Sequence, residues 1–566
     1  MSLVPDVEPG QIMDDAKKYK KRVLIVGAGA AGMACADTLS QHPDRFEVTL
    51  VEAQNYCGGQ MFSIPIDKEK YGANWLNQGV QGGSHIYHHT FHMFGKLEHR
   101  PHPVDLQVSF GKGGTFWTNV FPSQFVERHA KEIKRFSWVI KVMRWFELFF
   151  AMIPIKVSLK MFFFSDDVPT FMRSPLVTYP FKPLSSLALF LGTGNATPNL
   201  PTIMMERLYT SPTYGMWYPI DPQMLTSNLP PMVVFPEATR VYMDWKDALE
   251  AKGVRIRLET EVARILKRTR KGGVQVGLKA RKGTQNTTVA GVNPNANANE
   301  RGQLEQDAYE NEVIEEYDEI VFCVLADTAN KLLGKQARWI ENRVLGSTKW
   351  SDDITITHTD LDYMKKWYEI EFRDDLAVTD LKGRDESERV QKAKEIFKPM
   401  YYIKQTPADP RKLEMSFDCS AFQAQFPNDL PLENRVFQTI FLNKKHENTW
   451  SRDEIKRDKI ISENWWHQLC HSYTHYFFVV PWLFLLNGYR HTTYAGSWTL
   501  VNAHEVAVIS GVAAAYSLGA AYPKELDEDG FAKLCFRLYL LLVHGMWYRS
   551  GHGLGERCSA AEWQRS

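Results

Sequence analysis

Apolar and polar positions near the start of the chain follow the order strand, glycine turn, helix, strand. RVLIVGAGAAGMACADTL, residues 22 to 39, begins as an apolar run typical of a buried strand, breaks at three glycines and continues as a helical pattern. VTLVEA, residues 48 to 53, predicts a second strand, and a Gly-Gly turn follows it. This order is the start of a βαβ unit, so the sequence predicts a Rossmann-type domain that opens at about residue 21.

Further along the chain, the pattern predicts a hairpin, a loop and a second strand-to-helix unit. Residues 254 to 268 alternate like a half-exposed strand followed by another, and residues 317 to 334 predict a buried strand that leads into a helix. Residues 282 to 312 are rich in Asn, Gly and Thr, which indicates a mobile solvent loop that interrupts a hairpin. Residues 492 to 519 predict a strand, a glycine turn and a helix that opens near Glu505.

Two strongly apolar stretches do not have the form of a membrane-spanning helix. Residues 136 to 164 are broken by Pro154 and contain charged residues, and residues 476 to 486 are short and contain Pro481. The charged residues of the first stretch are Lys141, Arg144, Glu147, Lys156 and Lys160. We interpret the first stretch as two core helices of a substrate domain or, alternatively, as an element that lies on a membrane surface. We expect the second stretch to be buried core.

Composition and charge narrow the class of protein. The chain has 566 residues, of which 44% are hydrophobic and 13% aromatic, as expected for a globular protein of several domains. Lys and Arg total 67 against 66 Asp and Glu, so no overall basic field favours nucleic-acid binding. The seven cysteines form no CxxC pair, and the first 20 residues hold no apolar signal core. We therefore expect a cytoplasmic protein with reduced thiols that does not bind nucleic acid.

The glycines of the first turn point to a dinucleotide. Gly27, Gly29 and Gly32 form GxGxxG directly after a strand and at the start of a helix, where backbone amides and the helix dipole can face a pyrophosphate. Glu52 ends the next strand, 20 positions beyond Gly32, where a carboxylate can accept hydrogen bonds from a ribose. Glycine turn, strand context and acid together predict dinucleotide binding.

Two further features favour FAD over NAD. CGGQ, residues 57 to 60, is a second glycine turn that lets the chain run beside an extended flavin dinucleotide. At the C-terminal end, the amides of the helix that opens near Glu505 can face the pyrimidine edge of a flavin and stabilise the negative charge of the reduced ring. We therefore expect FAD as the cofactor.

Four collinear stretches resemble the flavin amine oxidase superfamily, and within it a microbial group described as predicted NAD/FAD-binding proteins. They are the glycine fingerprint with its Gly-Gly turn, TEVARI (260 to 265), DEIVFCVLADTANKLL (318 to 333) with ITITHTDLDYM (354 to 364), and GYRHTTYAGSWTLVNAHEVAVISG (488 to 511). The resemblance implies an α/β fold, with a Rossmann-type, amine-oxidase-like FAD-binding domain, an inserted mixed sheet and a helical substrate domain.

The resemblance also implies where FAD is held. The backbone of Val262 is expected at adenine, Gly58 and Gly59 along the ribityl-phosphate path, and residues 78 to 82 beside the flavin ring. The complete set of expected FAD-binding residues is Gly27, Ala28, Gly29, Ala31, Gly32, Glu52, Ala53, Gly58, Gly59, Gln60, Gln78, Gly79, Val80, Gln81, Val262, Gly496, Ser497, Glu505 and Val506. Gln60 replaces the arginine of the family and Ser497 its acid. No cysteine stands where relatives attach flavin covalently, so dissociable FAD is expected.

Several histidines and one tryptophan are candidates for other chemistry. HQLCHSYTH, residues 467 to 475, and HIYHHTFH, residues 85 to 92, have the spacing of one helix face, which can bind a metal, although we expect no metal here and interpret the second group as a wall near the flavin. The candidates for proton transfer are His504 beside Glu505 and His358 with Asp360. Trp498 is a candidate wall of the substrate pocket. Hydride transfer needs mainly alignment and exclusion of water, so no obligatory catalytic side chain is expected.

The expected domain organisation follows from these assignments. Residues 1–20 form an N-terminal arm, 21–100 the first FAD-binding part, 101–235 a helical substrate or cap domain, 236–335 the second FAD-binding part, 336–485 a substrate domain with a mixed sheet, 486–522 the third FAD-binding part and 523–566 a C-terminal helical extension.

The expected function is an FAD-dependent oxidoreductase that removes a hydride from an apolar or amine-bearing small molecule, which we expect to be lipid-like. The alternatives are a flavin-dependent isomerase that moves a double bond in unsaturated fatty acids or isoprenoids, and a flavin-binding scaffold without catalysis. The partners expected are a small apolar substrate and a membrane surface, the latter contacted peripherally through residues 136 to 164.

Overall fold

A parallel sheet organises one half of the molecule. The computed structural model describes residues 19–151, 153–154, 157, 201, 221–227, 229–280, 312–378, 384–406 and 408–551. The sheet has five strands in the order β10 (Arg255–Arg257), β2 (Phe46–Val51), β1 (Lys21–Val26), β14 (Glu319–Phe322) and β20 (Thr492–Tyr494). All neighbouring strands are parallel, and they come from four separate parts of the chain. The predicted βαβ start is thus present and is completed by later segments.

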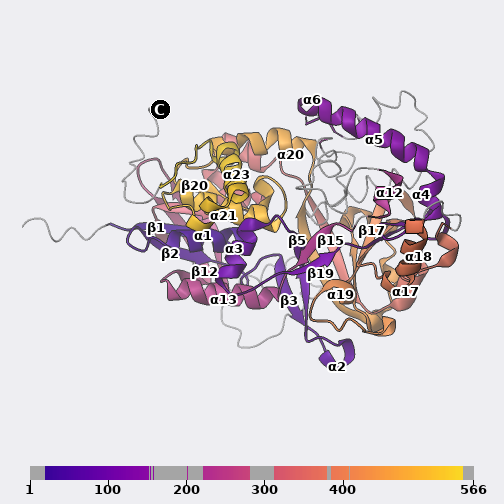
Figure 1. Ribbon diagram of the computed structural model, residues 1–566. Helices are drawn as coiled ribbons and strands as arrows, with labels where there is room; N and C mark the ends of the chain where they lie inside the picture. Colours follow the sequence, from indigo (N-terminus) through magenta and orange to yellow (C-terminus); the bar gives the residue numbers. More distant parts are fainter. Residues whose placement is uncertain are drawn as a thin grey trace, which may run out of the picture.

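Helices pack on this sheet or on the helices that cover it. The principal ones are α1 (Ala30–Ser40), α3 (His88–Lys96), α13 (Ala238–Ala251), α21 (His504–Ser517) and α23 (Gly530–Tyr539). Figure 1 shows α23 above this half of the molecule and α13 below it. A Cβ at Gly511 of α21 would lie 2.1 Å from the carbonyl oxygen of Ala31 in α1. The absence of a side chain at Gly511 therefore allows α1 and α21, the helices that follow the first and the last glycine turn, to approach closely.

A mixed sheet organises the other half (Figure 1). Its seven strands run in the order β19 (Ile460–Leu469), β15 (Trp350–His358), β18 (Phe437–Phe441), β17 (Asp409–Asp418), β16 (Tyr401–Thr406), β7 (Val108–Phe110) and β8 (Trp117–Thr118). Its pairs are antiparallel except β16 with β7, which is parallel. The expected fold class, an α/β protein with a Rossmann-type domain and an inserted mixed sheet, is confirmed.

Small sheets connect the halves and extend the first one. The connecting strands are β3 (Met61–Pro65) with β4 (Trp75–Gly79), and β5 (Gly82–Ser84), β9 (Pro231–Val234) and β6 (His102–Asp105). The first half also carries the antiparallel strands β11 (Thr260–Arg268), β12 (Val274–Ala280) and β13 (Val313–Tyr317). The predicted hairpin is therefore formed by β12 and β13, and the loop expected between them lies outside the described residues.

The apolar stretch from residue 136 is amphipathic where the structure describes it. α5 (Ala130–Trp145) and α6 (Glu147–Ala151) bury Met143 and Phe150, whereas Trp138, Trp145 and Phe149 are exposed. Most of the stretch beyond residue 151 lies outside the described residues. Within the described part of the chain, no helix has the length and apolar character needed to cross a membrane.

The expectation that residues 476 to 486 are buried core is wrong for about half of their side chains. They belong to α20 (Tyr473–Phe478) and η9 (Val480–Leu485), whose helical period turns one side inward and the other outward. The buried residues are Val479, Val480, Leu483 and Leu486. The exposed residues are Phe477, Phe478, Trp482, Phe484 and Leu485.

Candidate functional site

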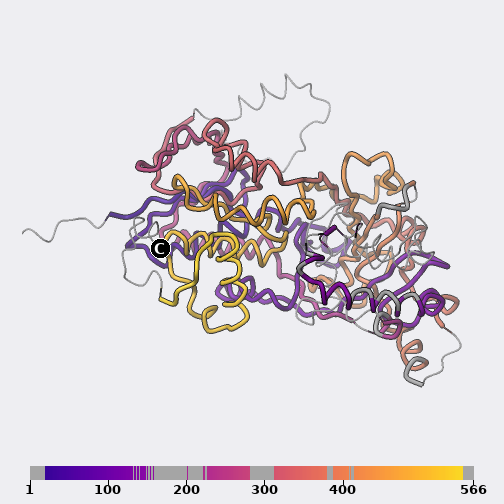
Figure 2. Tube along the Cα trace, turned by 90° about the horizontal axis from the view of Figure 1, so that it is seen from above, coloured from indigo at the N-terminus to yellow at the C-terminus, as the bar shows by residue number. Residues whose placement is uncertain are grey.

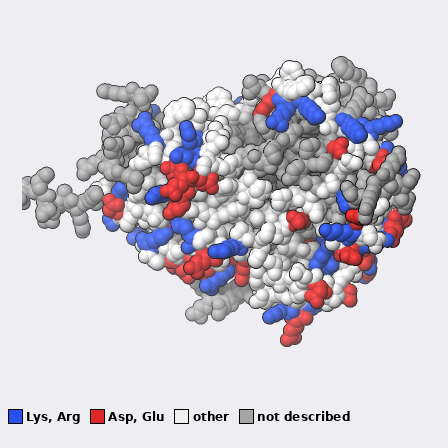
Figure 3. Space-filling model, in the orientation of Figure 1, with Lys and Arg blue, Asp and Glu red and all other residues white. Residues whose placement is uncertain are grey.

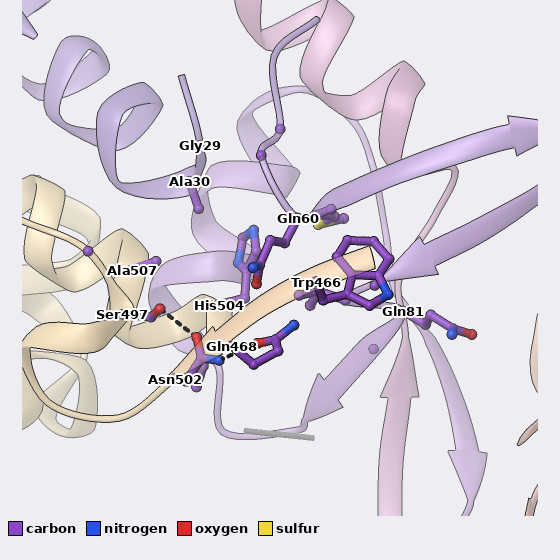
Figure 4. Close-up of a pocket in the computed structure, with 18 of the residues that line it drawn as sticks. Gly29, Ala30, Gln60, Gln81, Trp466, Gln468, Ser497, Asn502, His504 and Ala507 are labelled. Carbon is purple, nitrogen blue, oxygen red and sulfur yellow. Dashed lines mark hydrogen bonds between the residues drawn. The ribbon is translucent and has the colours of Figure 1, made fainter. Parts of the chain in front are cut away.

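A cavity of about 510 Å³ lies where the two halves meet. One end is lined by the glycine turns after β1 and β2, by the segment that joins β4 to β5, and by the start of α21. The other end is lined by side chains of the mixed sheet and of β9. Figure 4 shows that residues from both halves face this space.

Two of the three glycines after β1 leave room for neighbouring backbone carbonyls, and the third lines the cavity. A Cβ at Gly27 would lie 2.9 Å from the carbonyl oxygen of Cys323, and a Cβ at Gly32 would lie 1.9 Å from that of Gly27. A Cβ at Gly29 would meet nothing within 4 Å, because it points into the cavity. Gly29 is also the N-cap of α1 and supplies no side-chain cap, so the first amides of this helix remain available to an anion.

Glu52 stands at the end of β2 beside this turn and lines the cavity. Its carboxylate accepts hydrogen bonds from the backbone amides of Ala28 (2.8 Å) and Gln54 (2.9 Å). These bonds fix the carboxylate against the glycine turn. The remaining lone pairs can accept hydrogen bonds from ribose hydroxyl groups.

The second glycine turn touches the first. The Gly58 amide donates to the Ala28 carbonyl (2.9 Å), and a Cβ at Gly59 would lie 3.4 Å from the Cα of Gly29. The side-chain amide of Gln60 donates to the His467 carbonyl (3.3 Å), so Gln60 bridges the turn to β19 at the cavity wall (Figure 4).

The start of α21 forms a second uncapped helix terminus at the cavity. Its N-cap residue, Ala503, provides no side-chain hydrogen bond. The Ser497 hydroxyl donates to Asn502 Oδ1 (2.7 Å), and Asn502 Nδ2 donates to Gln468 Oε1 (3.0 Å), which joins the glycine turn to β19 (Figure 4). This network holds the turn in place while the first amides of α21 stay available for a ligand.

The side chain of Glu505 does not line the cavity but contacts the start of α3. Its carboxylate accepts hydrogen bonds from the amides of His89 (2.9 Å) and Thr90 (2.8 Å) and pairs with His89 Nδ1 (2.7 Å) at the start of α3. Burial opposes ionisation, but these contacts with His89 and Thr90 hold the pKa of Glu505 below its usual value. Glu505 therefore fixes the start of α21 to α3.

The candidate His504 lines the cavity, but both of its ring nitrogens have protein partners. Nδ1 lies 3.0 Å from Thr90 Oγ1 and Nε2 lies 2.9 Å from the Tyr242 hydroxyl. Burial lowers its pKa to about 4, so the ring is neutral at neutral pH. His504 is thus a positioning residue for α21, and the expectation that it transfers protons is not supported by this geometry.

The other two candidates lie in different environments. Trp498 lines the cavity, and its Nε1 donates to the Val324 carbonyl (3.1 Å). His358 lies outside the cavity, in the core of the mixed sheet, where its Nε2 lies 2.8 Å from Thr439 Oγ1 and its Nδ1 accepts from the Asp360 amide. Burial lowers the pKa of His358 to about 3. His358 therefore has a packing role in the mixed sheet and is not placed in the cavity for proton transfer.

The helical spacing expected for residues 467 to 475 is wrong. His467 is in β19, which continues to Leu469 because it pairs with β15, and α20 begins only at Tyr473. His467 pairs with Asp352 (2.6 Å) and Asp327 (3.1 Å). Among the described residues, no cluster of three or more His, Cys, Asp or Glu has the arrangement of a metal site.

The far end of the cavity is mostly apolar, and its residues carried no recognisable sequence signal. The lining side chains there include Met232, Val234, Met400, Phe417, Phe422, Ile440 and Trp466. The polar groups form a connected set, in which Gln423 donates to Gln81 (2.7 Å) and Gln81 donates to Gln438. These residues come from segments far apart in sequence, so only the folded chain assembles them.

One buried acid also lines this end. Asp353 on β15 accepts a hydrogen bond from the Asn443 amide (2.7 Å) through Oδ1, while Oδ2 has no hydrogen-bond partner among the described residues. Burial raises the pKa of Asp353 to about 6. Its carboxyl group is therefore an acidic feature of a mostly apolar cavity end.

The expected FAD-binding residues divide into two groups. Those that line the cavity are Gly27, Gly29, Ala31, Glu52, Gly58, Gly59, Gln60, Gly79, Val80, Gln81, Gly496 and Ser497. Those that do not are Ala28, Gly32, Ala53, Gln78, Val262, Glu505 and Val506. Of the second group, Val262 is buried in β11, and Ala53 is exposed after β2.

Comparisons with known proteins agree with this architecture. Residues 25–97 match a family model described as an NAD(P)-binding Rossmann-like domain. No curated protein sequence matches the chain. Similar solved structures include a CLA-producing fatty acid isomerase from P. acnes, with a TM-score of 0.52, 13% identity and coverage of 87% of this chain and 97% of that one.

Two amine oxidases are also similar in structure. Putrescine oxidase has a TM-score of 0.50 and 10% identity, with 88% of this chain and 99% of that chain covered. Cyclohexylamine oxidase from Brevibacterium oxydans IH-35A has a TM-score of 0.50 and 11% identity, with 88% and 100% covered. The chain therefore shares the fold of these solved structures, and such a fold is what its sequence resemblance implied.

Proposed function

We propose that the protein is an FAD-dependent oxidoreductase that binds FAD without a covalent bond and removes a hydride from an apolar or amine-bearing small molecule. The observation that carries this proposal is the composition of the cavity. Glycine turns and two uncapped helix termini line one end, and apolar side chains line the other. The first end suits phosphates and a flavin, and the second suits an apolar substrate.

The residues present fit FAD. The open space at Gly29 allows a pyrophosphate to approach the backbone, and Glu52 offers acceptors for a ribose. Cys323 is the cysteine among the lining residues, and it stands beside the glycine turn at Gly27 rather than at the apolar end. Burial raises the pKa of Cys323, which keeps its thiol protonated and unreactive. This arrangement supports dissociable FAD.

Bound FAD supplies the hydride acceptor for such a reaction. The chain's own contribution is orientation, exclusion of water and stabilisation of charge. The first amides of α21 and its dipole favour negative charge at the adjacent end of the cavity, and His504 and Glu505 hold that terminus in place. Because His504 has no free ring nitrogen, the proposal assigns it no proton transfer.

Anaerobic mixing with candidate substrates tests the proposal. Purified protein is mixed with amines, fatty acids and isoprenoids while the flavin absorbance is followed at about 450 nm. We expect a member of this panel to bleach the flavin and air to restore its colour with formation of peroxide. Ile440→Asn, at the apolar end, should slow bleaching while FAD content is kept, whereas Ile314→Asn, at an exposed position of β13, should change neither. Equal rates in both variants would contradict the placement of the substrate.

A flavin-dependent isomerase of unsaturated fatty acids or isoprenoids is the second candidate. It is favoured by the apolar chamber and by the structural likeness to a fatty acid isomerase. An isomerase would change the position of a double bond without net consumption of oxygen, whereas an oxidase consumes oxygen in proportion to product. A flavin-binding scaffold would show neither bleaching nor turnover.

We also propose that the stretch from residue 136 contacts a membrane surface peripherally. Trp145 and Phe149 are exposed on α5 and α6, beside the exposed cations Lys141 and Arg144. This mixture is typical of an interfacial helix, which buries an apolar side and keeps cationic ends in water.

A further inference from the structure

A second apolar surface lies on the other half of the molecule. On α20 and η9, Phe477 is 52% exposed, and Phe478, Trp482, Phe484 and Leu485 are also exposed. Val480, Leu483 and Leu486 on the inner side are buried. The segment is therefore anchored in the core and presents large apolar side chains outward.

The C-terminal helices continue this surface. Leu534, Leu538, Leu541 and Leu542 of α23 and η11 (Leu540–His544) are exposed and recur at the spacing of one helix face. Figure 2, seen from above, shows the yellow C-terminal part of the chain beside orange chain that precedes it in sequence. We call the exposed apolar side chains of α20, η9, α23 and η11, together with Trp547, the apolar face.

Direct contacts join the two parts of the apolar face. Asn487 Nδ2, after η9, donates to the carbonyl of Val543 in η11 (2.9 Å). A Cβ at Gly545 would lie 3.3 Å from Cβ of Phe484. The two segments are thus fixed side by side, and exposed apolar side chains on both form one patch, larger than the isolated apolar residues common on soluble surfaces.

Arginines border the apolar face. Arg343 lies 5.8 Å above the ring of Phe478, and Arg338 donates to the carbonyl of Leu485 (3.2 Å). Arg270 and Arg490 lie around the Tyr489 ring, at 5.0 and 5.8 Å. Among the described residues, Arg270, Arg343 and Arg490 form no ion pair with a carboxylate. The border of the face therefore carries uncompensated positive charge.

We propose that the apolar face docks on a lipid bilayer that contains anionic lipids. The apolar side chains enter the boundary between headgroups and acyl chains, and the arginines bind the anionic headgroups. α5 and α6 lie on the same, upper side of the molecule as α20 and α23 (Figure 1), and Figure 3 shows white surface and blue side chains, with some red, among the described residues along this side. Both can therefore meet one flat membrane, and the docking does not depend on the proposed reaction.

Vesicle flotation tests this proposal. The wild-type protein is floated with phosphatidylcholine vesicles that contain phosphatidylserine, and with phosphatidylcholine alone, at low and high salt. The apolar variant combines Phe477→Ser, Leu538→Ser and Trp547→Ser, and the charge variant combines Arg270→Gln, Arg343→Gln and Arg490→Gln. The control is Met243→Ser, because Met243 is 51% exposed on α13, on the opposite side of the molecule. Thermal melting and circular dichroism verify the fold of each variant.

The expected result is flotation of the wild type with anionic vesicles at low salt. The apolar variant should lose at least about tenfold in vesicle partition. The charge variant should lose roughly 100-fold on anionic vesicles, since each arginine near such a surface contributes about fivefold. The Met243 control should float like the wild type.

Three results would overturn the proposal. The first is a wild type that stays unbound, and the second is a folded apolar variant that floats normally. The third is a wild-type protein that does not float and is a dimer in light scattering, when the apolar variant is a monomer. A second copy of the chain would then cover the apolar face.

Discussion

Gly29 offers a substitution that separates cofactor binding from folding. Its backbone is extended, with φ −72° and ψ −178°, a conformation open to any residue. A Cβ at this position meets no protein atom within 4 Å. Gly29→Val should therefore fold normally and place its methyl groups where we expect the FAD pyrophosphate to approach the backbone.

The expected loss of affinity follows from the helix terminus. A displaced pyrophosphate gives up charge-assisted hydrogen bonds to the first amides of α1, each worth about 1.5–3 kcal/mol. Loss of two such bonds weakens FAD binding by about 3–6 kcal/mol, or roughly 10²- to 10⁴-fold.

The assay is the FAD content of purified protein, measured after denaturation, beside a thermal melt of the apo form. The control is Gly95→Val, because Gly95 is exposed in α3 and its Cβ would also meet nothing within 4 Å. Gly95→Val should keep its FAD. Undiminished FAD in folded Gly29→Val, or equal loss in both variants, would refute the reasoning.

The remaining predictions concern a loop, a helix pair and a buried acid. Removal of residues 284–310 should leave FAD content and melting temperature unchanged, because this composition cannot offset its ordering entropy; a large fall in either would contradict this. Phe150→Ser should lower the free energy of unfolding by about 3–5 kcal/mol in a urea titration, because Phe150 is buried, whereas exposed Phe149→Ser should keep stability but reduce vesicle binding. The pKa of Asp353 is raised from 3.8 to about 6, so the folded state keeps a proton that the unfolded state releases. Stability should then fall by about 3 kcal/mol as pH rises from about 4 to about 6, and Asp353→Asn should remove this part of the pH profile.

The features that the sequence predicted well are local ones. The strand, glycine turn and helix at the first domain depend on residues within one βαβ unit, and close backbone contacts at Gly27 and Gly32 explain why glycine stands there. The C-terminal strand, turn and helix were predicted for the same reason.

The features that the sequence did not predict depend on tertiary partners. His467 follows a strand geometry because β19 pairs with β15, which no local spacing reveals. Phe417 and Ile440 meet in the apolar chamber although they belong to different strands, and either could equally be a core residue. The local sequence does not show which side chains of η9 are exposed, because their exposure depends on the tertiary neighbours that cover the other side.

The most direct test of the account is the identity of the cofactor released by purified wild-type protein. We expect a yellow protein that releases FAD on denaturation, about one molecule per chain, into the supernatant rather than covalently attached to peptide. A colourless protein that takes up no FAD, or one that releases NAD alone, would contradict it.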